Sequence, residues 1–202
     1  MNRRIENKID VDVNKKIILF NWLQEKKAKK IYETRQINSI YFDNSKYTIY
    51  DDSVEGISPR KKIRVRFYGN FKDNNKQKIE IKYTFPYGRY KSTKEINTHS
   101  NIFDTGYLDD LYGVCMPKTI VSYKRTYFKL GLERLTFDEN ITYAKYDKNL
   151  NNLVFVFDPR IILEVKSNNF VNIEEIDKNI PFKTTRFSKY CESIDKLNLK
   201  MY

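Results

Sequence analysis

The sequence predicts an α+β fold dominated by one antiparallel β-sheet. Aromatic residues make up 15% of the 202 residues, with 16 Tyr and 13 Phe, and these residues together with Ile and Val favour strands. Segments that alternate polar and apolar residues recur between turn-forming stretches. Because the length suits one domain with a real core, we expect residues 1–202 to form a single domain.

The first quarter of the chain predicts strands around one helix. Alternation over residues 3–11 indicates a first strand. Asn14 can cap a helix over residues 15–31, in which apolar residues recur at helical spacing. Residues 36–43 then favour a strand, and a shorter strand is expected at residues 47–50.

The rest of the chain is mostly strand in pattern, with helices near its end. Further strands are expected at residues 61–68, 77–83, 89–96, 119–128, 132–143, 153–157 and 160–166. Helices are expected at residues 103–112, 173–179 and 188–197. The order therefore predicts about eight or nine strands in one sheet, with helices at the ends and one between strands.

The charge balance points to an anionic partner. Lys and Arg number 38 against 26 Asp and Glu, a formal net charge of +12. Such an excess suits nucleic acid, an acidic membrane surface or a phosphate-rich small molecule. A compositional bias toward Lys, Asn and Ile, as in an AT-rich genome, would produce the same excess without binding, so the placement of the charges must decide.

Several classes of protein are disfavoured by what the sequence lacks. Cys115 and Cys191 match no zinc or redox spacing, and a single histidine, His99, cannot build a histidine metal site or a catalytic triad economically. The start of the chain has no apolar signal region, and no window is apolar enough to span a membrane. We therefore expect a cytoplasmic protein without a membrane segment.

Charged residues recur at every second position of the expected strands. Lys62, Arg64 and Arg66 share one face of a strand whose other face is apolar, because successive side chains alternate. The same pattern recurs at Glu80 with Lys82, at Arg89 with Lys91, at Arg125, at Arg134 and at Glu164 with Lys166. If these strands share a sheet, one face is densely charged with a basic excess.

A charged face of this kind needs a polyanion once a barrel closes around it. Repulsion among cations in a low dielectric would be severe without one, and Arg and Lys are natural phosphate ligands. Glu80 and Glu164 suit Mg²⁺ or Mn²⁺, which prefer oxygen ligands. Cross-strand ion pairs with neighbouring lysines are the alternative for both glutamates, and spacing alone leaves the two readings open.

Motifs along nearly the whole chain resemble, in order, the VTC domain. This is the catalytic domain of polyphosphate polymerases in the triphosphate tunnel (CYTH-like) superfamily. The motifs are Arg4–Lys8, Ser39–Asp43, Lys62–Arg66, Ile79–Lys82, Tyr123–Arg125, Arg134–Asp138, Leu163–Lys166 and Phe187–Tyr190. The resemblance implies a closed eight-stranded antiparallel β-barrel, the triphosphate tunnel, with flanking helices.

The resemblance also implies site residues and an activity. Phosphate-binding residues would be Lys8, Lys62, Arg64, Arg66, Lys82, Lys91, Arg125, Arg134, Lys166 and Lys189. The catalytic subset would be Arg64, Arg66, Lys82, Arg125, Arg134 and Lys189. Glu164 would hold Mn²⁺ or Mg²⁺, with Glu6 and Glu80 as further ligands. The expected reaction moves the terminal phosphate of ATP onto a polyphosphate chain and releases ADP.

Two other functions fit the same residues. A triphosphatase or polyphosphatase needs the same cations and metal, with water as the acceptor, and a non-catalytic polyphosphate-binding protein needs only the cations. Stacking of RNA bases on the aromatic residues is disfavoured, because most of these residues alternate onto the apolar faces. The sequence leaves the preferred metal, the product length and the oligomeric state open.

Overall fold

A computed structural model describes residues 5–69, 77–96, 101–150, 152–167 and 170–200. The chain forms two compact units, each assembled from three stretches of sequence. The first unit comprises Met1–Gln36, Tyr123–Ile141 and Phe157–Phe187. The second unit comprises Ile37–Ser122, Thr142–Val156 and Ser188–Tyr202. Both units contain buried apolar side chains of their own.

The strands form one hydrogen-bonded path. In spatial order it contains β1 (Ile5–Val11), β10 (Ile161–Ser167), β8 (Glu133–Lys145), β7 (Gly113–Leu130), β2 (Lys29–Asp43), β3 (Arg60–Tyr68), β4 (Gln77–Phe85) and β5 (Gly88–Ile96). Two short strands lie off this path, β6 (Tyr107–Asp109) beside β7 and β9 (Val156–Asp158) beside β8. The pairs β1–β10, β10–β8, β2–β3, β3–β4 and β4–β5 are antiparallel.

The expected closed barrel is wrong, because the sheet is open. Its path ends at β1 and at β5. The outer edge of β1 is occupied by a loop: Ile9 bridges Thr184, and the Thr185 amide donates to the Lys8 carbonyl at 2.8 Å. Strand β5 is polar and largely exposed, as edge strands commonly are.

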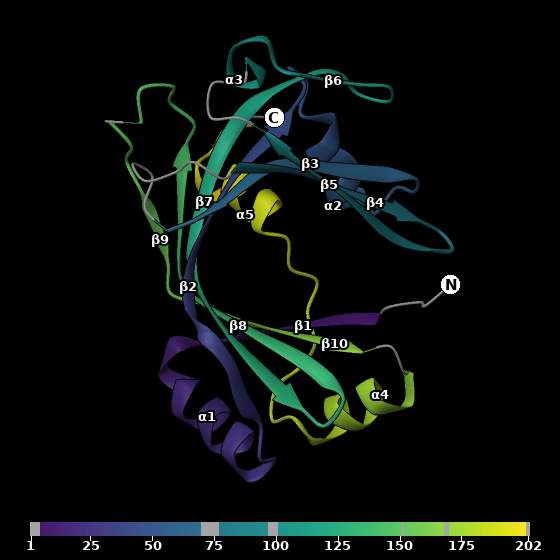
Figure 1. Ribbon diagram of the computed structural model, residues 1–202, viewed down its shortest axis with the longest axis vertical. Coiled ribbons are helices and arrows are strands. Elements are labelled where there is room, and N and C mark those ends of the chain that lie inside the picture. The colour runs from purple at the N-terminus through teal and green to yellow at the C-terminus, as the bar shows by residue number, and fades with distance from the viewer. Residues whose placement is uncertain (1–4, 70–76, 97–100, 151, 168–169, 201–202) are drawn as a thin grey trace. The chain divides into compact units, whose positions relative to one another are not determined.

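In the first unit, helices cover the apolar face of the sheet. Alternate residues of β1, β8 and β10 pack against α1 (Lys16–Glu25) and α4 (Phe170–Asn179), which lie beside these strands in Figure 1. The buried cluster contains Ile9, Val11, Leu19, Trp22, Leu23, Leu135, Phe137, Leu163, Val165, Ile176 and Ile180. The Trp22 indole N–H donates to the Asn179 carbonyl at 2.8 Å and so ties the two helices together.

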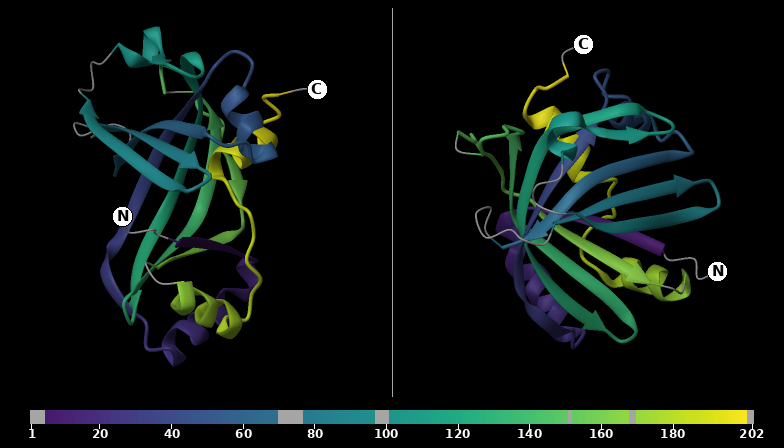
Figure 2. Two further views of the ribbon diagram at one scale, coloured as in Figure 1. Left: turned by 90° about the vertical axis from the view of Figure 1, so that its right-hand side faces the viewer. Right: turned by 45° about the horizontal axis from the view of Figure 1, so that its top comes forward.

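In the second unit, β2, β3, β4 and β5 lie side by side (Figures 1 and 2). Ile63 lies opposite Ile81 and Val65 opposite Ile79, and all four side chains are buried. Helices α2 (Thr48–Glu55) and α5 (Lys189–Lys196) contact each other. In the part of the chain that the structure describes, no helix is long and apolar enough to cross a membrane.

Three expected elements differ from the structure. The strand expected at residues 47–50 is wrong, since Thr48 begins α2. The helix expected over residues 15–31 ends at Glu25, where Lys27 adopts a positive φ of 54° and β2 follows from Lys29. Instead of a helix over residues 103–112, α3 (Ile102–Thr105) ends at Gly106 with φ 81°, and β6 follows. Of the expected first strand, residues 3 and 4 lie outside the described residues, as does His99.

Candidate functional site

Charged residues of the second unit gather on one face of β3, β4 and β5. The strand register places Arg64 opposite Glu80, and Lys62 opposite Lys82, which in turn lies opposite Lys91. We name this group the Arg64 cluster; it comprises Lys62, Arg64, Arg66, Glu80, Lys82 and Lys91. The alternation expected from the sequence therefore holds, and the structure brings six predicted site residues together on one face.

Glu80 is the acidic centre of the Arg64 cluster. Its Oε2 accepts hydrogen bonds from Arg64 Nε at 2.9 Å and Nη2 at 2.6 Å, and lies 3.6 Å from Arg66 Nη1. Its Oε1 accepts from Lys91 Nζ at 3.0 Å. Burial raises the pKa of Glu80, but Arg64, Arg66 and Lys91 outweigh it and hold the pKa at about 2. Glu80 is therefore ionised and fixes the position of both arginines.

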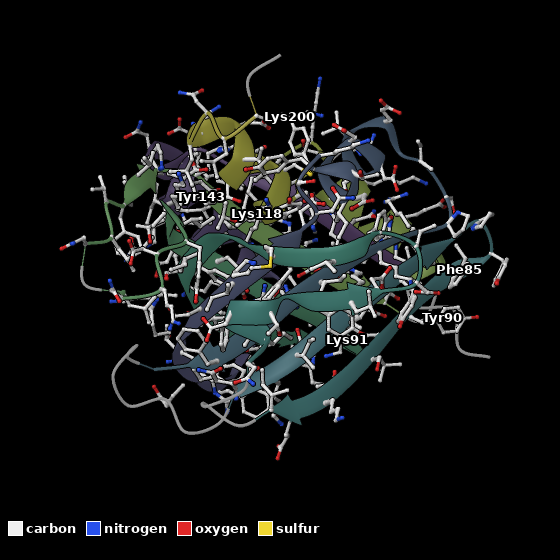
Figure 3. The ribbon with its side chains drawn as sticks, turned by 90° about the horizontal axis from the view of Figure 1, so that it is seen from above. Phe85, Tyr90, Lys91, Lys118, Tyr143 and Lys200 are labelled. Atoms are coloured by element: carbon white, nitrogen blue, oxygen red, sulfur yellow. The ribbon has the colours of Figure 1, made fainter. Side chains whose placement is uncertain are left out.

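Three lysines lie in a row across neighbouring strands of this cluster. Like charges directly opposite each other in an antiparallel pair destabilise a sheet. Lys62, Lys82 and Lys91 nevertheless occupy facing positions on β3, β4 and β5, and Figure 3 labels Lys91 together with Tyr90 of the same strand. Side chains in this arrangement are suited to binding a polyanion.

The start of α5 lies beside the Arg64 cluster. Ser188 caps the helix, and its Oγ accepts a hydrogen bond from Lys62 Nζ at 2.8 Å. The predicted residue Lys189 follows directly as the first residue of the helix. Tyr190 stacks on Tyr41 with ring centroids 5.3 Å apart, and the Tyr41 hydroxyl accepts from Arg64 Nη1 at 3.1 Å. Helix α5 thus supports the arginine through Tyr190 and Tyr41.

A second group of charges occupies one face of β1, β7, β8 and β10 in the first unit. The register places Lys8 opposite Glu164, Glu6 opposite Lys166, and Lys166 opposite Arg134. We name this group the Arg125 cluster; it comprises Glu6, Lys8, Arg125, Arg134, Asp138, Glu164 and Lys166. Six of its members are predicted site residues, and Asp138 is an addition.

Arg125 is the most strongly held cation of its cluster. Its Nε and Nη2 donate to the two oxygens of Asp138 at 2.5 and 2.6 Å, a bidentate pair in which both side chains are buried. Its Nη2 also lies 3.6 Å from Glu164 Oε2. Burial alone would lower the pKa of Arg125, but Asp138 raises it well above its usual value. The guanidinium is therefore permanently charged and rigidly placed.

Lys166 lies between two glutamates. Its Nζ is 3.0 Å from Glu6 Oε1 and 3.2 Å from Glu164 Oε1. Burial lowers the pKa of Lys166 to about 8; Glu6 opposes this shift, while Arg125 and Arg134 add to it. A buried lysine close to two arginines gains from any anion that enters, since the anion would stabilise its protonated form.

The glutamates differ in how well they suit a divalent metal ion. Both oxygens of Glu80 are taken by arginine and lysine donors, which is the geometry of an ion pair. Glu6 and Glu164 instead converge on one ammonium group, so this position accepts a cation between carboxylates, the oxygen donors that Mg²⁺ and Mn²⁺ prefer. Among the described residues, no group of three or more His, Cys, Asp or Glu side chains is placed to hold a metal ion. Glu6 and Glu164 are thus the two predicted metal ligands that the structure brings together, with the Lys166 ammonium between them.

Sequence reasoning missed several polar residues that hold the site. Asp138 lies at the same strand parity as Arg134, so the alternation rule could have found it. Tyr41 likewise lies opposite Arg64 on the neighbouring strand. The stacking of Tyr190 on Tyr41 joins residues that are far apart in the sequence, and no local pattern could have predicted it.

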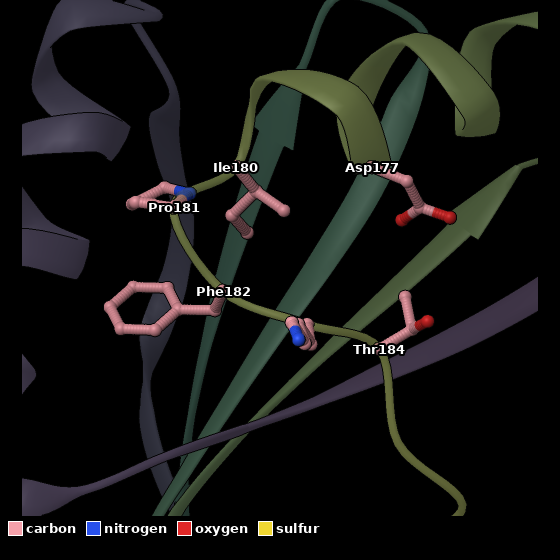
Figure 4. A pocket seen from close by; sticks show the side chains of 6 residues that line it. Asp177, Ile180, Pro181, Phe182 and Thr184 are labelled. Atoms are coloured by element: carbon pink, nitrogen blue, oxygen red, sulfur yellow. The ribbon is translucent and has the colours of Figure 1, made fainter.

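A cavity of about 520 Å³ opens elsewhere in the first unit, after the end of α4 (Figure 4). It is lined by Asp177, Ile180, Pro181, Phe182, Lys183 and Thr184. None of these residues was predicted as a site residue. Asp177, on its wall, accepts a hydrogen bond from the Asn7 amide, which ties α4 to β1.

The fold recurs in solved structures that share little sequence. A candidate adenylate cyclase from Vibrio parahaemolyticus is 11% identical with a TM-score of 0.54, over 96% of this chain and 98% of that one. A Pyrococcus horikoshii protein is 14% identical with a TM-score of 0.57, over 93% and 98%. A candidate adenylyl cyclase from Hippeastrum, reported to have a dominant triphosphatase activity, is 14% identical with a TM-score of 0.53, over 95% and 96%. No curated protein sequence matches the chain.

The antiparallel sheet is the fold that these structures share, and it defines the structural class of the chain. Within that class, the profile of one family, the VTC domain, matches residues 1–105 and 111–198. The chain therefore belongs to the VTC domain family, as the order of its motifs predicted.

Proposed function

We propose that the chain is a metal-dependent polyphosphate polymerase that moves the γ-phosphate of ATP onto a polyphosphate chain. The observation that carries this proposal is the row of facing lysines, Lys62, Lys82 and Lys91, beside two fixed arginines. A row of like charges on neighbouring strands becomes favourable when a chain of phosphates neutralises it. Membership of the VTC domain family supports the same substrate class.

The residues of the two clusters take distinct roles in this reaction. Arg64, Arg66, Arg125 and Arg134 bind and orient phosphate oxygens and stabilise the charge that develops on the transferred group. Lys8, Lys62, Lys82, Lys91, Lys166 and Lys189 bind further phosphates. An oxygen of the terminal acceptor phosphate attacks the γ-phosphorus, the bond to the β-phosphate oxygen breaks, and ADP leaves with that electron pair.

No protein nucleophile is required, and Cys115 is unsuited to be one. Burial raises the pKa of the Cys115 thiol to about 12, so its thiolate is scarce at neutral pH. Glu164 and Glu6 would hold Mn²⁺ or Mg²⁺, which would neutralise charge on phosphate oxygens when bound. Glu80 acts in this proposal by holding Arg64 and Arg66 rather than as a metal ligand.

Product analysis tests the proposal. Purified protein is incubated with ATP and Mn²⁺, with Mg²⁺ in parallel, and ADP, orthophosphate and polymer are followed together. We expect polymer to appear with ADP and to be lost in Arg64→Ala and Glu164→Ala. Lys91→Ala should reduce the rate, whereas its matched control Lys94→Ala, on the other face of β5, should not. ATP consumption without polymer, with a primer supplied, would contradict a polymerase.

Hydrolysis is the second candidate, with water in place of the phosphate acceptor. The same arginines and metal serve both reactions, and the Hippeastrum protein that shares the fold is reported as a triphosphatase. Orthophosphate released from ATP or inorganic triphosphate, with no polymer, would identify this activity. Tight triphosphate binding without turnover of either substrate would identify a binding protein.

A further inference from the structure

Helix α1 is apolar on two opposite faces. The inner face belongs to the core of the first unit, where Leu19, Trp22 and Leu23 are at most 5% exposed. The outer face and the preceding turn, η1 (Val13–Lys15), also carry large apolar side chains. Their exposed fractions are 45% for Val13, 64% for Ile17 and 45% for Ile18. Phe20 is 38% exposed, but its ring packs against Phe137 of the core, with ring centroids 5.3 Å apart.

Three of these residues, Val13, Ile17 and Ile18, lie close together where the helix begins. Val13 and Ile17 are four residues apart, a spacing that aligns side chains along one side of a helix, and Ile18 follows Ile17 about a quarter-turn further round. Single exposed apolar residues are ordinary, but a contiguous patch marks a surface that contacts a partner or a membrane. We name Val13, Ile17 and Ile18 the apolar stripe.

Lysines flank both ends of the apolar stripe. They are Lys15, Lys16, Lys26, Lys27, Lys29 and Lys30. All but Lys16 are exposed, and Lys16 pairs with Glu139 at 2.5 Å. Between residues 12 and 30 only Asp12 and Glu25 carry negative charge. The surface is therefore apolar along its centre and strongly basic at both ends.

We propose that the apolar stripe and its flanking lysines bind an anionic lipid membrane surface. An interfacial helix buries its apolar face at the boundary of headgroups and acyl chains, while basic residues contact anionic headgroups. A second copy of the chain would bring the same lysines together, and their repulsion disfavours that occupant. This surface is distinct from both charged clusters, so the inference does not depend on the proposed function.

Vesicle sedimentation tests the proposal with the whole chain. We expect binding to vesicles of phosphatidylcholine mixed with phosphatidylglycerol, and much weaker binding to phosphatidylcholine alone. The double variant Ile17→Ser/Ile18→Ser should weaken binding about tenfold or more, because it removes two buried apolar side chains. Lys26→Gln/Lys27→Gln should weaken it roughly thirtyfold, about fivefold per lysine. The control Leu132→Ser changes a side chain that is 88% exposed in the β7–β8 turn and should leave binding unchanged.

Saturating inorganic triphosphate separates this surface from the phosphate-binding clusters. Binding through the apolar stripe should persist when triphosphate is present, and circular dichroism should show each variant folded. Binding that triphosphate abolishes, or that the double isoleucine variant leaves unchanged, would overturn the proposal. So would a concentration-dependent dimer in light scattering that this variant dissociates, since the stripe would then be an interface between copies.

Discussion

Glu80 illustrates how one carboxylate can hold several cations in place, a role that suits the proposed phosphate site. Its two oxygens accept hydrogen bonds from Arg64 and Lys91, and Arg66 lies 3.6 Å away. An isolated arginine on a strand samples many rotamers, whereas one held by a carboxylate is ordered before the substrate arrives. Repulsion between Glu80 and the substrate is outweighed by the surrounding cations.

Glu80→Gln should change the acid stability of the protein. A carboxylate whose pKa falls on folding contributes stability above its unfolded pKa of 4.5 and loses it as the pH falls toward about 2. The contribution above pH 4.5 is roughly 3 kcal/mol. Urea unfolding at a series of pH values between 5 and 2 measures this contribution. As the pH falls, the free energy of unfolding should decline less steeply for Glu80→Gln than for the wild type. Parallel declines would contradict the pairing.

Lys166 should give triphosphate binding a pH dependence near neutrality. With its pKa lowered to about 8, the ammonium loses its proton as the pH rises through that value, and the Arg125 cluster then loses one positive charge. Affinity should therefore fall above about pH 8 in the wild type. In Lys166→Met this fall in affinity should be absent, and binding at neutral pH should be weaker than in the wild type. Calorimetric titration of triphosphate over a series of pH values measures both effects.

The pair of Arg125 and Asp138 is the buried ion pair whose disruption should cost most. Removing one partner leaves the other charged and buried, which typically costs about 3–5 kcal/mol. Arg125→Ala should destabilise the protein by that amount, and Arg125→Met/Asp138→Leu by much less. Denaturant unfolding compares the variants, with Lys124→Ala, the exposed neighbour on the other face, as control. A double variant that loses as much stability as Arg125→Ala, or more, would contradict the idea that the unpaired buried charge causes the loss.

At the scale of elements, strand alternation was a reliable guide and element ends were not. The parity of charged residues correctly placed Arg64 with Glu80 and Lys166 with Arg134, because a strand's period of two is fixed by its backbone. Residues 47–50 instead begin a helix, since Asp43 on β2 accepts hydrogen bonds from the amides of Ile49 and Tyr50. These hydrogen bonds form only because the chain after β2 turns back toward Asp43, and the strand propensity of residues 47–50 carries no information about that turn.

The buried carboxylate of Asp43 joins α2 and α5 to the end of β2. Besides the amides of α2, its Oδ2 accepts from the Tyr190 hydroxyl at 2.5 Å, and Tyr190 stacks on Tyr41 beside Arg64. Asp43→Asn should lower the free energy of unfolding by about 1–3 kcal/mol, because an amide cannot accept all these bonds. Tyr190→Phe removes one donor and should cost about 1 kcal/mol. Thermal unfolding of both variants compares the two losses of stability. A loss in Tyr190→Phe that equals or exceeds the loss in Asp43→Asn would contradict this hydrogen-bond network.

At the scale of the whole chain, the family could be read from motif order, but closure of the sheet could not. Periodicity indicates which residues face the same side and is silent on whether the two end strands meet. The loop at Thr184 and Thr185, which occupies the edge of β1, has no periodic signal. The division into two units likewise arises from contacts between distant stretches, so composition alone gave no sign of it.

Triphosphate titration tests the central claim, that the charged faces of both units bind phosphate. Inorganic triphosphate is titrated calorimetrically into the wild type, into Lys91→Ala and Arg134→Gln, and into the opposite-face controls Lys94→Ala and Lys124→Ala. We predict binding that both cluster variants weaken by about tenfold or more and both controls preserve, since each lost charge-assisted hydrogen bond removes about 1.5–3 kcal/mol. Wild-type protein that fails to bind triphosphate, or binding that neither cluster variant weakens, would contradict the account.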